Sequence, residues 1–498
     1  MNLLPVLMIF VPVLAALLIP LGLFSPRRVS LWAGGINLII ALKMYWMYQL
    51  DVGGYQFVTR IPLSGVHAFF PISLHFGVDG ISLPLVLLTA IVTLAAVAVS
   101  SENIRRAKEF YIYLLLISAG AIGAFTALDL FFFYGFHEVA LIPTFLMIGI
   151  WGSHDRKTVA TQITLYLSAG SLVLLIGLLL FYFHAPTHPP TFDLVDLQQQ
   201  LGAGSIPLAS SQAIFLLLLI GFGTLVSLWP FHNWAAPAYR SAPPSVAMMH
   251  AGVLKKFGIY GLLRLAEPFL PQMHGAGSYL NLLLILLVFN VVWIGYVTIA
   301  QKDLGLMLGF SSVMHMGYLF LGIAAGLSFF REPQAIIPLT GVVLLMVGHG
   351  LSTALLFALS GEIRQRLGTL NMTEIGGLAS KTPQLVLLFV IGALASIGVP
   401  GFANFTGEIL IFFGSWHASP CPTVFCIFGL IISAIYMLRA VRNVFYAEPS
   451  QLVASKEIKD VTVIWPYLLL IVPLLTIGFW PKTITAMAQP SIERLLGL

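Results

Sequence analysis

Charge and cysteine are scarce in this sequence. Among its 498 residues, Asp, Glu, Lys and Arg together make up 9% and hydrophobic residues 59%, whereas an average soluble domain has roughly 25% charged residues. A water-soluble globular protein is therefore excluded, and so is intrinsic disorder, which requires low hydrophobicity and high charge. With only two cysteines, Cys421 and Cys426, a disulfide-stabilised scaffold is excluded as well.

Cofactor motifs are also missing. The sequence has no G-x-G-x-x-G, no P-loop, no paired C-x-x-C and no H-E-x-x-H. These patterns bind dinucleotides, phosphates, iron–sulfur clusters or zinc. We therefore expect no cofactor and no metal in this chain.

Long apolar stretches make up most of what is present. A membrane-spanning helix uses about 20 residues, and fourteen stretches of roughly that length or longer occur along the chain. They fall at residues 3–24, 30–50, 79–100, 110–128, 130–151, 160–184, 211–231, 245–268, 278–299, 303–326, 336–360, 383–413, 421–446 and 461–480. The pattern predicts an all-helical integral membrane protein with about 14 transmembrane helices embedded in the lipid bilayer.

The distribution of lysine and arginine predicts the sidedness. Of these 24 residues, sixteen lie in turns after odd-numbered stretches, and four lie in turns and tails on the other side. Because basic loops remain in the cytoplasm, we expect the basic turns there and both termini outside. The net charge of +5 is then mainly an orientation signal, so nucleic-acid binding has no support.

Two of the apolar stretches are interrupted by proline and glycine. The seventh runs into the segment WPFHNW (229–234), and the twelfth contains GVPGFAN (398–404). Because proline removes a backbone donor and clashes with the preceding turn, both helices are predicted to break. The predicted hinge residues are Pro230, His232, Pro400 and Gly401.

The spacing of the broken helices predicts an internal repeat. Helices seven and twelve are five apart, which divides the chain into helices four to eight (110–268) and helices nine to thirteen (278–446). These units would be inverted relative to each other, with helices one to three (1–109) before them and helix fourteen with its tail (461–498) after them. Paired broken helices in inverted repeats are typical of ion pathways, although prolines that merely kink packed helices are the alternative.

Several ionisable side chains lie inside the apolar stretches. Each costs about 2.5–3.5 kcal/mol at the bilayer centre on insertion scales, so each requires a reason. They are Glu138, Lys255, Lys256, His315, His349 and Glu408. Buried carboxyl, amine and imidazole groups can exchange protons near neutrality, so the set favours a proton relay. The alternatives are a structural hydrogen bond for a lone histidine such as His349 and a structural ion pair for Glu138 or Lys256. Lys255 and Lys256 project about 100° apart on a helix and should have different surroundings.

These segments resemble a known family. The resemblance rests on 131–152 (FFFYGFHEVALIPTFLMIGIWG), 229–234, 251–264 (AGVLKKFGIYGLLR), 311–318 (SSVMHMGY), 348–363 (GHGLSTALLFALSGEI), 375–383 (IGGLASKTP) and 398–416 (GVPGFANFTGEILIFFGSW). Together they are similar to the antiporter-like membrane subunits of respiratory complex I, and most similar to the M-type. The resemblance covers nearly the whole chain.

The resemblance implies a proton-translocating subunit of an NADH:quinone oxidoreductase, which we expect in a bacterial inner membrane. The sidedness expected from lysine and arginine then puts both termini on the periplasmic side. It implies that NADH, FMN, iron–sulfur clusters and quinone bind only to other subunits, and that the partners are other antiporter-like and small membrane subunits. Glu138 matches the buried acid of the fifth helix, and Lys256 matches the lysine of the eighth. His315 and His349 match the polar axis that follows, and Glu408 matches the acid of the M-type twelfth helix.

One position departs from the family pattern. The family usually has a lysine seven residues before the histidine of the broken seventh helix, where it pairs with the acid of the fifth helix; here that position is Leu225. Either Lys255, His250 or His137 supplies a replacement base, or the chain is a lateral-conduction or scaffold subunit with altered pumping. The remaining alternative is a subunit of a multi-subunit cation/proton antiporter or of a membrane-bound hydrogenase-type complex.

Overall fold

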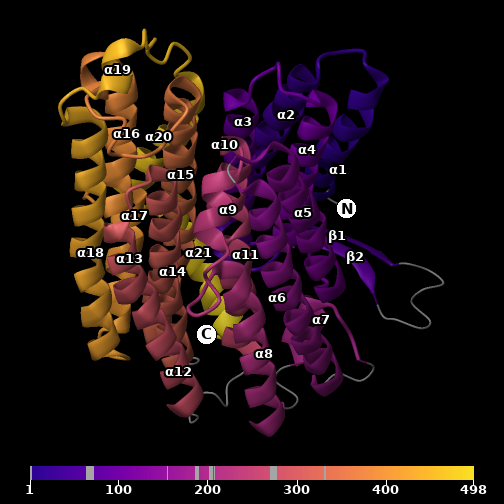
Figure 1. Ribbon diagram of the computed structural model, residues 1–498. Helices are drawn as coiled ribbons and strands as arrows, with labels where there is room; N and C mark the ends of the chain where they lie inside the picture. The colour runs from indigo at the N-terminus through magenta and orange to yellow at the C-terminus, as the bar shows by residue number, and fades with distance from the viewer. Residues whose placement is uncertain are drawn as a thin grey trace.

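Long helices lying side by side form most of the molecule (Figure 1). The computed structural model describes residues 3–62, 72–153, 155–185, 190–200, 206, 208–269, 277–329 and 332–498. The helices from the first part of the chain form one side of the bundle, those from α12 to α18 form the other, and α9 to α11 lie between them (Figure 1).

The first half of the chain contains eleven of the described helices. They are α1 (Leu4–Leu18), α2 (Pro26–Met47), α3 (Ser82–Val99), α4 (Ala107–Thr126), α5 (Leu130–Trp151), α6 (Arg156–His184), α7 (Leu194–Gln200), α8 (Leu208–Val226), α9 (Ala235–Ser241), α10 (Pro244–Met249) and α11 (Lys256–Phe269). A π-helical turn, His250–Leu254, joins α10 to α11.

The second half continues the same architecture. Its described helices are α12 (Gly277–Val288), α13 (Ile294–Ala300), α14 (Leu304–Ser328), α15 (Ile336–Leu367), α16 (Pro383–Ile397), α17 (Ala403–Ser415), α18 (Pro420–Val441), α19 (Gln451–Ser455), α20 (Trp465–Phe479) and α21 (Lys482–Leu496). Two more π-helical turns, Phe289–Trp293 and Arg442–Tyr446, follow α12 and α18.

The prediction of a mostly helical membrane protein is confirmed. Within the described residues, ten helical segments are long and apolar enough to cross a membrane, or eleven if α20 and α21, bent by 70°, count as one. Stretches seven and twelve of the sequence appear instead as shorter apolar helices, Ser210–Val226 and Pro383–Ile397, because each is interrupted by a break.

Both breaks predicted from proline and glycine are present. Helix α8 ends at Val226 and α9 begins at Ala235, so Pro230 and His232 lie between them. Likewise α16 ends at Ile397 and α17 begins at Ala403, with Pro400 between them. Gly398 and Gly401 have φ values of 83° and 97°, a left-handed conformation that glycine adopts without steric cost.

The expectation of an all-helical chain is wrong in one segment. Strands β1 (Gln56–Pro62) and β2 (Ser73–Val78) form an antiparallel hairpin, in which Arg60 lies opposite His75. β1 contains aromatic and β-branched residues, which favour strands. Outside the membrane helices the backbone groups of this segment still need partners, and pairing the two strands supplies them.

Candidate functional site

Lys256 lies at the centre of a buried polar axis. It is the first residue of α11, directly after the π-helical turn and Lys255, and its side chain is completely buried. Its Nζ lies 2.7 Å from the carbonyl oxygen of Ala251 and 2.8 Å from Nδ1 of His349 on α15. An ammonium group only donates, so Nδ1 of His349 accepts this hydrogen bond when Lys256 is protonated.

His315 continues the axis on α14. Its ring centroid lies 5.5 Å from that of His349. Its Nδ1 lies 2.8 Å from the carbonyl oxygen of Ser311, and its Nε2 lies 3.0 Å from that of Ser396. Ser396 is in the last turn of α16, where carbonyl groups have lost their helical partners, so the break in the twelfth stretch provides the acceptor for His315.

Lys255 points elsewhere. Its Nζ lies 3.4 Å from the hydroxyl of Ser312 on α14 and 5.5 Å from the ring centre of Tyr239. The hydroxyl of Tyr239 lies 3.2 Å from Nδ1 of His250. The prediction that the two lysines have different surroundings is confirmed, and both are buried. Lys255 and His250 belong to the Tyr239 cluster rather than to Glu138.

Glu138 belongs to α5 and faces α6. Among the ionisable residues predicted to take part in proton transfer, its side chain is the most exposed. Its side chain is 29% exposed. Oε1 accepts a hydrogen bond from Ser171, whose hydroxyl also lies 3.0 Å from that of Tyr134. Nδ1 of His137 lies 3.6 Å from the same Oε1. Of the three replacement bases considered, His137 is therefore the one that approaches Glu138.

His137 also packs against the residue that follows Lys256, although its Nδ1 makes no hydrogen bond within the described residues. Its ring stacks on Phe257 with a centroid distance of 4.1 Å, and Phe257 follows Lys256 in the chain.

Leu225, on α8, is buried in the apolar core with 4% exposure. Nδ1 of His232, in the first break, is buried without a hydrogen-bond partner among the described residues.

Glu408 occupies the other end of the set, on α17. It is 1% exposed, and its Oε1 has no hydrogen-bond partner in the described part of the chain. Gly398, in the second break, abuts its carboxyl group, so that a side chain at this position would collide with Glu408. The break thus makes room for a buried acid. Asn404 links the same helix to α15 through a 3.2 Å hydrogen bond to Ser352.

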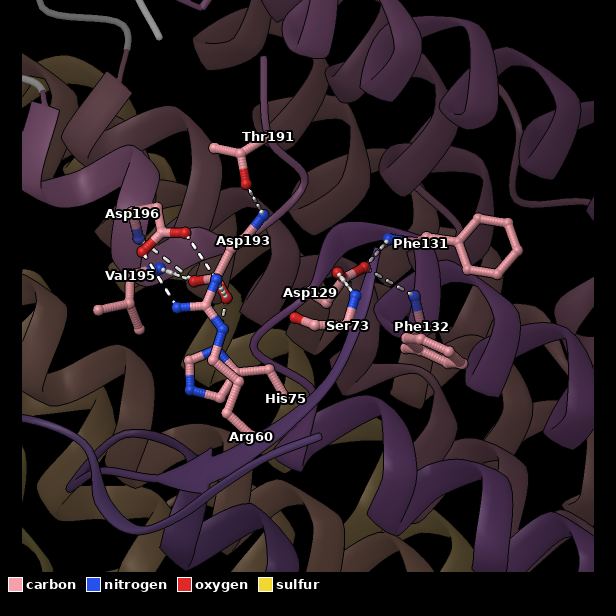
Figure 2. A network of polar contacts seen from close by, with 10 residues as sticks. All are labelled: Arg60, Ser73, His75, Asp129, Phe131, Phe132, Thr191, Asp193, Val195 and Asp196. Atoms are coloured by element: carbon pink, nitrogen blue, oxygen red, sulfur yellow. Dashed lines mark hydrogen bonds and ion pairs between the residues drawn. The ribbon is translucent and has the colours of Figure 1, made fainter. Parts of the chain in front are cut away.

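A second polar network joins the hairpin to the start of α5 (Figure 2). Asp193 accepts from Nδ1 of His75 at 2.6 Å, and Arg60 lies 3.2 Å from Asp193 and 2.8 Å from Asp196. Asp129 caps α5 and accepts from the backbone N–H of Ser73, at 2.9 Å. The prolines and short strands of this region gave no indication of the network, so sequence reasoning missed it.

Charge and burial act differently on two acids of this network. Burial raises the pKa of Asp129 to about 6, despite hydrogen bonds from the backbone of Ser73, Phe131 and Phe132. Burial also acts to raise the pKa of Asp193, but the hydrogen bond and charge of His75, together with the charge of Arg60, outweigh it and lower the pKa.

We expect Asp129 to titrate near pH 6. Its pKa in the folded chain lies above its ordinary value of 3.8, so the folded chain holds this proton more tightly than the unfolded chain does. The stability that Asp129 contributes is therefore complete below pH 3.8 and is lost as the pH rises through about 6. Infrared difference titration of the purified protein should show a carboxyl band that disappears in this range and is missing in Asp129→Asn. A band that titrates near pH 4 would contradict the expectation.

The backbone pairing of this network recurs elsewhere in the chain. Residues 128–130 pair with 192–194 through N–H to carbonyl bonds of 2.8 and 2.9 Å, and 302–304 pair with 370–372 through bonds of 2.8 and 2.9 Å. In both copies an aspartate, Asp129 or Asp303, caps the following helix. The partner residue, Asp193 or Asn371, donates its N–H to a threonine hydroxyl two positions earlier.

Known proteins share this arrangement. The fold, with many apolar helices, two broken helices and buried ionisable residues between them, defines a multi-pass membrane protein of the antiporter-like class. Residues 127–435 match the family described as NADH:quinone oxidoreductase/Mrp antiporter, TM. The chain therefore belongs to this family, and within it to the type called subunit M or chain 4.

Individual relatives are similar over most of their length. NADH-quinone oxidoreductase subunit M of Escherichia coli is 31% identical over 490 residues, covering 95% of this chain and 93% of that protein. NAD(P)H-quinone oxidoreductase chain 4 2 of Trichodesmium erythraeum is 35% identical over 457 residues, covering 88% and 77%. A chain of respiratory complex I from Thermus thermophilus superposes with a TM-score of 0.85 at 28% identity, covering 99% of this chain and all of that one.

Proposed function

We propose that this chain carries protons across the membrane along its buried polar axis, as a subunit of a proton-translocating NADH:quinone oxidoreductase. The observation that carries the proposal is the contact between Lys256 and His349, 2.8 Å apart, and its continuation to His315. Electron transfer takes place in other subunits of the assembly, which bind NADH, FMN, iron–sulfur clusters and quinone. The enzymatic activity thus belongs to the assembly.

Each group has a role that its surroundings support. Lys256 is the central carrier, because its proton already points at an acceptor nitrogen. His349 and His315 extend the relay, since imidazole accepts at one nitrogen and donates from the other. Both nitrogens of His315 face carbonyl oxygens, so His315 exchanges one of these hydrogen bonds for one with His349 when it takes up a proton. Glu138 is the gate, because its partial exposure lets it meet a neighbouring subunit or water. Glu408 is the terminal acid, held beside the second break.

His137 takes the place of the base that the family has at position 225. It lies 3.6 Å from Glu138 and stacks on Phe257, next to Lys256. A protonated imidazole here would stabilise the Glu138 carboxylate as a lysine does in the family. Lys255 and His250 are occupied with Ser312 and Tyr239, which makes them weaker candidates.

The fourteen-helix topology with two inverted repeats, 110–268 and 278–446, is part of the proposal. Each predicted span coincides with one or more described helices, and the two breaks occupy equivalent places in the two units. The paired networks around Asp129 and Asp303 support the inversion. The Asp129 network adjoins the hairpin. In the Asp303 network, Nε of Arg240, from one of the basic turns, lies 2.9 Å from Oδ2 of Asp303.

The proposed orientation has the basic turns in the cytoplasm of a bacterium, because basic loops remain there, and both termini outside. Contacts among the turns support their common location. The basic turns bond to one another: Arg27 to the carbonyl oxygen of Ala98, Lys108 to that of Pro20, and Arg364 to Ser153. The C-terminal helix instead meets the segment before the hairpin, through Tyr48 and Ser491 at 3.2 Å.

Purification of the native assembly tests the proposal. We expect the chain to co-purify with flavin-containing and iron–sulfur subunits and with other membrane subunits, and liposomes containing the assembly to take up or release protons when NADH is oxidised. Cation/proton exchange by an assembly without flavin would instead favour the antiporter alternative. A hydrogen-oxidising assembly would favour the hydrogenase-type complex.

A further inference from the structure

Asn290 is a completely buried amide in the ninth apolar stretch. It lies in the π-helical turn Phe289–Trp293, which follows α12. Its Oδ1 lies 2.7 Å from the backbone nitrogen of Trp229, and its Nδ2 lies 2.7 Å from the carbonyl oxygen of Val313 on α14. A backbone N–H only donates and a carbonyl oxygen only accepts, so both ends of this amide face the partner that they require.

The first of these bonds stabilises the first break. Trp229 lies between α8 and α9, where the helix is interrupted, and backbone groups released inside a membrane need partners from the protein. Asn290, 61 positions later in the chain, supplies the acceptor for the Trp229 N–H. The Trp229 ring also stacks on Phe289, with a centroid distance of 4.7 Å. The π-helical turn thus holds both the backbone and the side chain of Trp229.

The second bond reaches the helix that carries His315. Val313 lies two positions before His315 on α14, and Gly317 lies two positions after it. A Cβ at Gly317 would lie 2.4 Å from Cγ2 of Val291, so glycine lets the π-helical turn approach α14 closely. Two positions correspond to about 200° around a helix. The turn therefore packs on the side of α14 that faces away from His315.

We infer that Asn290 is a positioning residue of the proton relay, which fixes the first break and the backbone around His315 to one buried turn. When His315 exchanges a carbonyl partner for His349, its ring moves while its backbone has to keep its distance from α15. The bond from Asn290 to α14 supplies that support from behind. The first break belongs to 110–268 and α14 to 278–446, so Asn290 also joins the two proposed repeats.

The inference rests on the proposed function, and its test removes the amide while keeping its volume. Asn290→Leu should speed hydrogen–deuterium exchange of the Trp229 backbone amide by about fivefold, because one hydrogen bond is lost. Mass spectrometry of peptides that contain Trp229 measures this. Asn290→Asp should keep the exchange slow, since a carboxyl oxygen still accepts from the N–H. Exchange in Asn290→Asp as fast as in Asn290→Leu would contradict the inference.

Proton translocation is the second measurement. In liposomes containing the assembly, proton transfer through the Asn290→Leu chain should fall on the order of 100-fold, the cost of a displacement of about 1 Å at a reacting group, while NADH oxidation continues. If Asn290→Leu does not assemble, Asn290→Ala removes the same two bonds without adding apolar bulk and replaces it in both measurements.

Asn37→Leu is the matched control. Asn37 is a buried amide in α2, and its Nδ2 lies 3.0 Å from the carbonyl oxygen of Met8 on α1. It thus bonds between two membrane helices without contacting the break or α14. Asn37→Leu should leave proton translocation and Trp229 exchange as they are in the unaltered protein. An equal loss of translocation in Asn37→Leu and Asn290→Leu would overturn the positioning role.

The outcomes separate this inference from the proposed function. If Lys256→Met abolishes proton transfer through this chain while Asn290→Leu leaves it unchanged, the positioning role is wrong and the relay stands. Unchanged Trp229 exchange in Asn290→Leu would also overturn the inference without affecting the relay. If Lys256→Met leaves the number of protons moved per NADH unchanged, the proposed function is wrong, and the inference is wrong with it.

Discussion

Lys256→Met is expected to abolish proton transfer through this chain while the assembly remains intact. The substitution removes the only group that bonds both to the Ala251 carbonyl and to Nδ1 of His349 in the described part of the chain. A positioned acid–base group contributes typically about 10²–10⁴-fold to a proton-transfer rate, so we expect a loss of at least on the order of 100-fold. Methionine has a similar length and suits a buried site, since apolar replacements of buried charges often pack well.

The measurement is formation of a pH gradient in liposomes, followed with a pH-sensitive dye during NADH oxidation. Lys43→Met is the matched control: Lys43 lies within α2, another apolar helix, but on its exposed side. The control should form the gradient at the rate of the unaltered protein. If Lys256→Met matches the control, Lys256 is not the carrier.

His137→Phe is expected to weaken proton translocation, and Leu225→Lys to restore it. Phenylalanine keeps the stacking on Phe257 but removes the nitrogen that lies 3.6 Å from Glu138. An ion pair that solvent can reach contributes about 0.2–1 kcal/mol, so we expect a loss of at most about fivefold in rate. Leu225→Lys in the same chain returns a base to the position where the family usually has it.

Translocation by His137→Phe, by Leu225→Lys and by the double variant decides between the candidate bases. Lys255→Met, tested in parallel, should leave translocation close to that of the unaltered protein, because Lys255 points at Ser312 and Tyr239. A silent His137→Phe together with an inactive Lys255→Met would assign the replacement base to Lys255 instead.

Much of the fold follows from the sequence because membrane helices are local structures. Apolar length places the long helices, whereas α7, α19 and α21 lie outside the predicted stretches. The proline and glycine segments at 229–234 and 398–404 place both breaks. The hairpin was missed because its strands are only seven and six residues long and lie in a segment between two apolar stretches. The repeated pairing around Asp129 and Asp303 had a sequence signal, a Thr-x-Asp at 191–193 and a Thr-x-Asn at 369–371, which a search for internal repeats in the loops could have found.

The candidate site was predictable in its members but not in its contacts. Burying an ionisable side chain in the membrane costs free energy, so such a residue inside an apolar stretch is a candidate functional residue. This is why Lys256, His315, His349 and Glu408 could be predicted as members of the site. Side-chain direction depends on the π-helical turn before Lys255 and Lys256 and on helix packing, which leave no signature in one sequence. For the same reason Ser171 and Tyr134 could not be predicted as neighbours of Glu138.

The number of protons moved per NADH oxidised tests the central claim most directly. It is measured in liposomes containing the purified assembly, with Lys256→Met compared with the unaltered protein. If protons pass through this chain, the ratio falls by the share that this subunit contributes, while electron transfer to quinone continues. An unchanged ratio in a fully assembled Lys256→Met complex would contradict the account.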